Sequence, residues 1–169
     1  MITLLPRLRR FARGLTGSEV EADDLVQAAC ERAIQRIGQW QPGTRLDSWM
    51  FRIMQNLWID AIRMGKLRGS HLSVVDPESH HTPGMDGEQA TMNRLTLEAV
   101  RRGVQRLPPD QRSVLLLVCV EGHSYKETAD TLGIPVGTVM SRLSRARLAL
   151  NRMVGGPDSE VAAVGGGEA

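Results

Sequence analysis

Apolar residues recur every three to four positions through most of this chain, which is the spacing of amphipathic helices. In the first half the pattern predicts three helices, over residues 3–15, 19–38 and 47–64. The breaks between them carry turn signals, Thr16-Gly17 and Pro42-Gly43. Three helices joined by short connections predict a small bundle.

The helical periodicity stops near residue 65 and returns at residue 94. The residues between are rich in glycine, proline and acids, which predicts a linker over 69–93. Fully extended, this linker could span about 80 Å at roughly 3.3 Å per residue. A helix over 94–106 and another from Leu107-Pro-Pro-Asp110 to Gly122 follow, and the apolar run 114–120 should form the core beneath the next two helices. We therefore expect an all-α fold of two small helical domains joined by a flexible linker. The expected domains are residues 1–68 and 94–154. A linker over 69–93 joins them, and a disordered tail over 155–169 follows the second domain.

Residues 124–147 predict a helix-turn-helix. Ser124 and Glu127 have the spacing of a capping box, so a helix should start between them. Gly133 follows the last apolar residue of that helix, where glycine adopts the left-handed conformation at the least cost. In the second helix Val139 and Leu143, four positions apart, should pack against the first.

The outward side of the second helix predicts contact with DNA. Short polar and guanidinium groups there suit base edges and phosphates, and a lysine near the start of the first helix suits a phosphate. The candidate DNA-binding residues are Lys126, Thr138, Ser141, Arg142 and Arg145. The alternative is a plain helical hairpin with a solvated basic face.

Charge and cysteine content narrow the class of protein further. The formal net charge is only +2, yet two basic blocks, 1–69 and 94–154, flank an acidic stretch, as suits a protein that grips a polyanion at two places. The two cysteines, Cys30 and Cys119, lie in apolar stretches, which predicts buried thiols in a reducing cytosol; a disulfide or a metal site is the alternative. No apolar run approaches the roughly 20 residues of a membrane span, and no signal peptide is expected.

Nothing in the sequence predicts catalysis. There is no nucleophile elbow, phosphate-binding loop or paired-histidine metal motif. The His80-His81 pair lacks cysteine or acidic partners at metal-ligand spacing, so a solvated loop is expected. We expect no catalytic residue, no cofactor and no metal site.

Taken together, the two halves resemble bacterial sigma factors of the extracytoplasmic-function (ECF) class in the sigma-70 family. The first half matches the family's region 2 in Ala22-Asp-Asp-Leu-Val-Gln27 and in Trp49-x-x-Arg52-x-x-x-Asn56-x-x-x-Asp60-x-x-Arg63. The second half matches region 4 in Leu107-Pro-Pro-Asp-Gln-Arg112 and in Gly137-Thr-Val-Met-Ser-Arg-Leu-x-Arg-Ala-Arg147. The match covers residues 3–68 and 95–153, and the long middle domain of housekeeping sigma factors is absent.

The resemblance implies a three-helix region 2 bundle and a region 4 helix-turn-helix domain. It implies core RNA polymerase and promoter DNA as partners, a bacterial cytoplasmic location, and association with the nucleoid when bound to polymerase. It also implies an anti-sigma factor that covers the polymerase-docking surfaces. A regulator without polymerase, or a decoy that sequesters an anti-sigma factor, remains an alternative; such a decoy is expected to carry an attached receiver domain, for which this chain has no room.

Residue roles follow from the matched motifs. The resemblance implies polymerase binding by Asp24, Gln27, Glu31 and Arg32. The family reads the upstream promoter element as a single strand, with a base flipped into a pocket beside the loop 41–47. The residues implied there are Arg45, Arg52, Asn56, Asp60 and Arg63. Trp49 and Trp58 could each pack in the core or stack on a base, and packing is favoured for both. Met140 departs from the family, many of whose members have a basic residue at this position.

Overall fold

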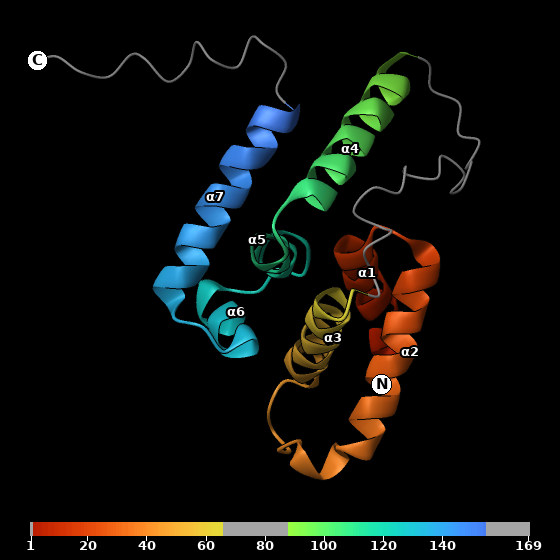
Figure 1. Ribbon diagram of the computed structural model, residues 1–169, viewed down its shortest axis with the longest axis vertical. Coiled ribbons are helices and arrows are strands. Elements are labelled where there is room, and N and C mark those ends of the chain that lie inside the picture. Colours follow the sequence, from red (N-terminus) through yellow and green to blue (C-terminus); the bar gives the residue numbers. More distant parts are fainter. Residues whose placement is uncertain (1, 66–87, 155–169) are drawn as a thin grey trace, which may run out of the picture.

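The structure is a computed structural model that describes residues 2–65 and 88–154, and within these ranges all regular elements are helical (Figure 1). The expected all-α fold is thereby confirmed. The elements are η1 (Ile2–Leu4), α1 (Leu5–Thr16), α2 (Glu19–Gln35), η2 (Ile37–Gln39), α3 (Leu46–Arg63), α4 (Glu88–Arg106), α5 (Pro109–Leu115), η3 (Leu116–Val120), α6 (Tyr125–Leu132) and α7 (Val136–Val154). Below, the first half means 2–65 and the second half means 88–154.

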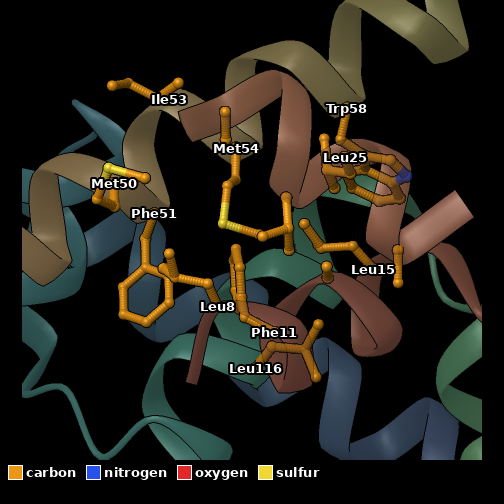
Figure 2. Packing of buried hydrophobic residues seen from close by; sticks show 14 of the residues in the cluster. Leu8, Phe11, Leu15, Leu25, Met50, Phe51, Ile53, Met54, Trp58 and Leu116 are labelled. Atoms are coloured by element: carbon orange, nitrogen blue, oxygen red, sulfur yellow. The ribbon is translucent and has the colours of Figure 1, made fainter. Parts of the chain in front are cut away.

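The first half forms the expected three-helix bundle. Helix α1 ends where Gly17 takes a positive φ of 76°, and the Ser18 hydroxyl accepts a hydrogen bond from the Glu21 backbone at the start of α2. The rings of Phe11 and Phe51 lie 4.8 Å apart at the centre of the bundle (Figure 2). Trp58 is buried, which confirms its assignment to packing. Because each buried position follows the helical repeat, local pattern and core agree here.

Helix α4 begins earlier than the apolar pattern predicts. It starts at Glu88 rather than at residue 94, so residues 88–93, which were assigned to the linker, are helical. The apolar repeat does not begin until Leu95, but Glu, Gln, Ala and Met in this stretch are good helix formers without one. The rest of the predicted linker, 69–87, with the His80-His81 pair, and the predicted tail, 155–169, lie outside the described residues.

The helix-turn-helix has the predicted local structure. The Ser124 hydroxyl accepts from the Glu127 backbone N–H at 3.1 Å, and the Glu127 carboxylate accepts from the Ser124 backbone N–H at 2.8 Å. Gly133 takes a φ of 67° between α6 and α7. Val139 and Leu143 are buried against the first helix of the motif. The capping and turn signals are therefore sufficient to define this segment.

The central helix serves two cores, which corrects the prediction for its apolar run 114–120. Val114 and Leu115 pack beneath the helix-turn-helix, but Leu116 and Leu117 belong to the core of the first half (Figure 2). The helix widens to π geometry over η3, where Glu121 N–H donates to the Leu116 carbonyl at 3.0 Å. A π turn changes the angular spacing of side chains, so one apolar run can face two directions.

The two halves are packed against each other in this structure. Helix α1 contacts α4, α5 and η3, and α3 contacts α6. Figure 1 shows α5 at the centre, between the bundle of α1, α2 and α3 and the pair α6 and α7. The sequence predicted two tethered domains but not this contact between them.

The cysteines differ from the prediction. Both are free, but Cys119 is exposed and Cys30 is only partly buried, so the expectation of buried thiols is wrong for Cys119. The apolar run around Cys119 ends in η3, where the side chain turns outward beside Arg147, with Nη2 3.9 Å from the sulfur. None of the described helices is both long and apolar enough to cross a membrane.

Candidate nucleic-acid and polymerase interfaces

Three polar residues line the outer face of α2. Asp24, Gln27 and Glu31 are all exposed, and the Gln27 side-chain amide donates to the Glu31 carboxylate at 3.1 Å. Arg32, at the end of the same helix, is partly buried. The structure therefore brings Asp24, Gln27 and Glu31 together on an exposed face of α2, with Arg32 partly buried at the end of that face.

A second polar surface runs along α3. Arg52, Asn56, Asp60 and Arg63 are exposed, while Met50 and its neighbours on the opposite side enter the core. At 1.5 Å per residue this stripe is roughly 16 Å long, enough to meet several nucleotides of a single strand. We call these four residues the α3 stripe.

Arg45 is paired with acidic side chains. Its guanidinium donates to the Asp47 carboxylate through Nη2 at 2.7 Å and Nε at 3.1 Å, and it also forms an ion pair with Glu127 of α6. Hydrogen bonds from Arg45, and then from Arg7, hold the pKa of Asp47 well below its usual range. Burial acts in the opposite direction and would by itself raise this pKa. Arg45 is thus engaged by groups of both halves.

The recognition-helix candidates divide into two groups. Lys126 and Arg145 are exposed, as is Met140, 53% of whose surface is accessible. Thr138 and Ser141 are partly buried, and the Ser141 hydroxyl donates to the Thr138 carbonyl at 3.1 Å.

Arg142 differs from the outward placement that the sequence predicted. Its side chain is 28% exposed and its Nε lies 3.1 Å from the Asp110 carboxylate of α5. The guanidinium therefore has an acidic partner within the chain, and contact with DNA would require it to leave or share that partner.

Arg112 has a structural role that sequence reasoning missed. It is 2% exposed and donates to the carbonyls of Leu15 at 2.5 Å and Leu107 at 3.2 Å, and to the Gln105 side chain at 2.9 Å. Burial lowers its pKa to about 10, so it stays charged at neutral pH. The position of Arg112 at the end of the Leu-Pro-Pro-Asp-Gln-Arg motif could have indicated an important residue. The motif does not reveal which groups accept its hydrogen bonds.

His123 lies at the interface between the two halves, a position that no sequence motif indicated. It is 3% exposed, its ring meets Phe51 edge-on at 5.5 Å, and neither ring nitrogen has a hydrogen-bond partner among the described residues. Burial is the main cause that lowers the pKa of His123, so the ring is neutral at physiological pH. Within 2–65 and 88–154, no group of three or more His, Cys, Asp or Glu side chains is placed to hold a metal ion.

The fold and these surfaces define an all-α protein that joins a helix-turn-helix to a bundle with two exposed polar faces. The family profile described as "Sigma-70, region 4" matches residues 97–150, and the profile described as "Sigma2 domain of PhyR" matches residues 1–55. The ECF RNA polymerase sigma factor EcfG of Rhodopseudomonas palustris is 35% identical over 174 aligned positions, which cover 99% of this chain and 93% of that protein.

Solved structures agree with these matches. The sigma factor RpoE from Bartonella quintana, in complex with the anti-sigma factor NepR, is 28% identical with a TM-score of 0.71 and covers 90% of this chain and 92% of its own. The anti-anti-sigma factor PhyR from the same organism, complexed with NepR, shares the fold at 21% identity and a TM-score of 0.59, over 90% of this chain and 48% of PhyR. This chain belongs to the ECF sigma factors of the sigma-70 family. It is therefore a transcription initiation factor that directs RNA polymerase to promoters.

Proposed function

We propose that this sigma factor binds core RNA polymerase through the outer face of α2 and reads promoter DNA through the α3 stripe and α7. One observation carries the assignment: α2 and α3 bury one side in a common core and leave separate, polar, uncovered faces on the other. Polar surfaces of this kind, on rigid helices, are suited to binding rather than to stability.

The polymerase contact follows from the charge of the α2 face. Asp24 and Glu31 are acidic and exposed, and Gln27 lies between them on the same side of the helix. Such a face attracts arginines on a partner, and Arg32 at its edge would add a contact of the opposite sign. Charge complementarity of this kind raises the association rate and fixes orientation.

The proposed promoter contacts involve both single-stranded and double-stranded DNA. The α3 stripe offers an amide and guanidinium groups, which can hydrogen-bond an extruded base and its phosphates and so offset the few kcal/mol that extrusion costs. Arg145 and Lys126, with Thr138 and Ser141, suit the double-stranded element, where phosphate contacts set position and base contacts set sequence.

We also propose an anti-sigma factor as a partner, and a cytoplasmic location with association to the nucleoid when the chain is bound to polymerase. The similar RpoE chain was solved in complex with the anti-sigma factor NepR, which supports the first proposal. A pull-down that recovered polymerase and no other specific partner would count against it.

The polymerase contact is tested by reversing charge on α2. Asp24→Lys with Glu31→Lys is expected to weaken binding to core polymerase at least about tenfold, because it removes two attractive charges and adds two repulsive ones. Binding is measured by co-elution and by promoter-dependent transcription with the core enzyme.

The control carries the same charge change on the same helix. Glu19 and Asp23 pair with Arg13 and Arg9 of α1 within the first half, and exposed pairs of this kind contribute little to stability. Glu19→Lys with Asp23→Lys should bind polymerase nearly as well as the natural chain. Equal loss in both double variants would overturn the assignment of the α2 face.

The recognition helix is tested by removing two of its guanidinium groups, those of Arg142 and Arg145. Arg142→Ala with Arg145→Ala is expected to weaken binding to a duplex selected by the natural holoenzyme. It should lower the slope of log affinity against log salt by about 0.9, the contribution of one phosphate contact, because Arg145 is exposed whereas Arg142 is paired with Asp110. Arg101→Ala with Arg102→Ala, both exposed on α4, is the control. An unchanged slope in the α7 variant would remove these arginines from the interface.

One observation favours a second candidate function. The first 55 residues match the sigma-like domain of PhyR, a protein described as an anti-anti-sigma factor, and the fold resembles PhyR as well. A decoy of this kind would bind an anti-sigma factor without initiating transcription. Absence of any promoter-dependent transcript with core polymerase would favour the decoy over the sigma factor.

A further inference from the structure

Arg142 of the recognition helix α7 is paired with an acid that belongs to a different helix. Its Nε lies 3.1 Å from the Asp110 carboxylate, and both side chains are partly exposed. Asp110 lies in the first turn of α5, where the helix dipole favours a negative charge. The pair therefore joins the helix beneath the helix-turn-helix to the helix that is proposed to read duplex DNA.

The core of the second half fixes the backbones that carry this pair. Val114 and Leu115 of α5 pack in one cluster with Val139 and Leu143 of α7, and Leu143 is the residue next to Arg142. Since both helices are anchored in this core, Asp110 can restrict the Arg142 side chain before DNA arrives. A side chain that is already restricted loses less conformational entropy when it binds.

The ion pair engages only one side of the Arg142 guanidinium. Asp110 lies beside Nε, and neither Nη1 nor Nη2 has a hydrogen-bond partner within residues 2–65 and 88–154. These two nitrogens form a planar fork of donors, which matches two acceptors on one edge of a ligand. Guanine presents such acceptors in the major groove, its O6 and N7 atoms, and the contact of arginine with guanine is the commonest base-specific one.

The charge of Asp110 favours a base over a phosphate as the target of Arg142. A carboxylate beside the guanidinium offsets its positive charge and repels a phosphate, whereas the acceptors of guanine are neutral. Arg145 and Lys126 are exposed and have no acidic partner among the described residues, so they remain suited to phosphates. The helix-turn-helix thus carries two kinds of cation, with different expected targets.

We propose that Asp110 is a positioning residue that aims Arg142 at one guanine of the double-stranded promoter element. Arg142 reads the base, and Asp110 contributes to specificity without touching DNA. This inference rests on the proposed function, in which α7 reads duplex promoter DNA. It adds to that function a pair of residues that reads one base, and the identity of that base.

Base discrimination by the whole holoenzyme tests this role of Asp110. A duplex promoter fragment is selected from random sequence with the natural holoenzyme, and each base pair of its double-stranded element is then changed in turn. Competition binding should reveal one position where the natural protein prefers G·C by at least about tenfold and Arg142→Ala does not. Asp110→Asn should reduce the preference at this position to about threefold or less and leave the other positions unchanged.

The control makes the same change of acid to amide within the helix-turn-helix. Asp130 is exposed on α6 and has no partner among the described residues. Asp130→Asn also removes one negative charge, so it matches any general gain in affinity for DNA, and it should discriminate as the natural protein does. Circular dichroism verifies that both variants keep their helix content. Uniform weakening by Asp110→Asn at every position, or equal loss of preference in Asp130→Asn, would overturn the proposal.

A double-mutant cycle tests whether Asp110 acts through Arg142. In a chain that already carries Arg142→Ala, Asp110→Asn should cause no further loss of discrimination, because the arginine that it positions is gone. A further loss at that position, or a preference lost with Arg142 at a base pair other than G·C, would contradict the proposal.

The same data separate this inference from the proposed function. If Arg142→Ala removed the preference for G·C and Asp110→Asn did not, the role of Asp110 would be refuted while α7 remained the reader of duplex DNA. If neither Arg142→Ala nor Arg145→Ala changed the binding of any fragment, the proposed function of α7 would itself be refuted.

Discussion

Replacing Arg112 with alanine is expected to lower the free energy of unfolding by at least about 3 kcal/mol. The guanidinium supplies donors to the Leu15 carbonyl at the end of α1 and to the Leu107 carbonyl between α4 and α5. Alanine would leave these acceptors buried and unsatisfied, and each such group costs about 1–3 kcal/mol. It would also open a space beside Trp58, whose ring centre lies 5.4 Å from the guanidinium carbon.

Urea unfolding followed by circular dichroism measures this change. Arg106→Ala is the control, since Arg106 is an exposed arginine near the end of α4 and its loss should change stability by no more than about 0.5 kcal/mol. Arg112→Lys should fall between the two, because an ammonium keeps the charge but lacks the planar fork. Equal stability of the two alanine variants would show that Arg112 does not link the halves.

Removing two groups of the α3 stripe should have the largest effect on activity. Arg52→Ala with Asn56→Ala is expected to reduce promoter-dependent transcription by at least about tenfold, which corresponds to about 1.4 kcal/mol. Each lost contact to a base is worth about 1–3 kcal/mol, and both side chains are exposed, so the change should not disturb the core. The measurement is single-round transcription with core polymerase at a saturating concentration of the sigma factor.

The control removes the same two residue types elsewhere. Arg102→Ala with Asn151→Ala changes exposed positions on α4 and α7, and it should leave transcription within about twofold of the natural chain. Binding to core polymerase should be the same for all of these proteins. If the α3 variant transcribed normally, the upstream element would have to be read by other residues.

Several local features of the fold were predictable because their causes lie within a few residues. The capping box of Ser124 and Glu127 and the left-handed Gly133 define the helix-turn-helix without help from the rest of the chain. The polar residues of α2 and α3 were likewise expected on exposed faces, since the apolar repeat assigns the opposite faces to the core. The α4 boundary was missed because helix propensity, rather than apolar periodicity, decides the residues from Glu88 to Asn93.

Local sequence patterns were enough to predict the helices, the helix-turn-helix and the polar faces of α2 and α3, and the motifs indicated the sigma-factor family. The contacts between the two halves became visible only in three dimensions: Leu116 enters the core of the first half, Glu121 bonds to α1, and Arg45 and Arg142 pair with acids. The physical reason is range. Helix caps and amphipathic faces arise from residues three or four positions apart, whereas the bonds of Glu121 join residues separated by 111 and 114 positions, and no local pattern encodes such a pairing.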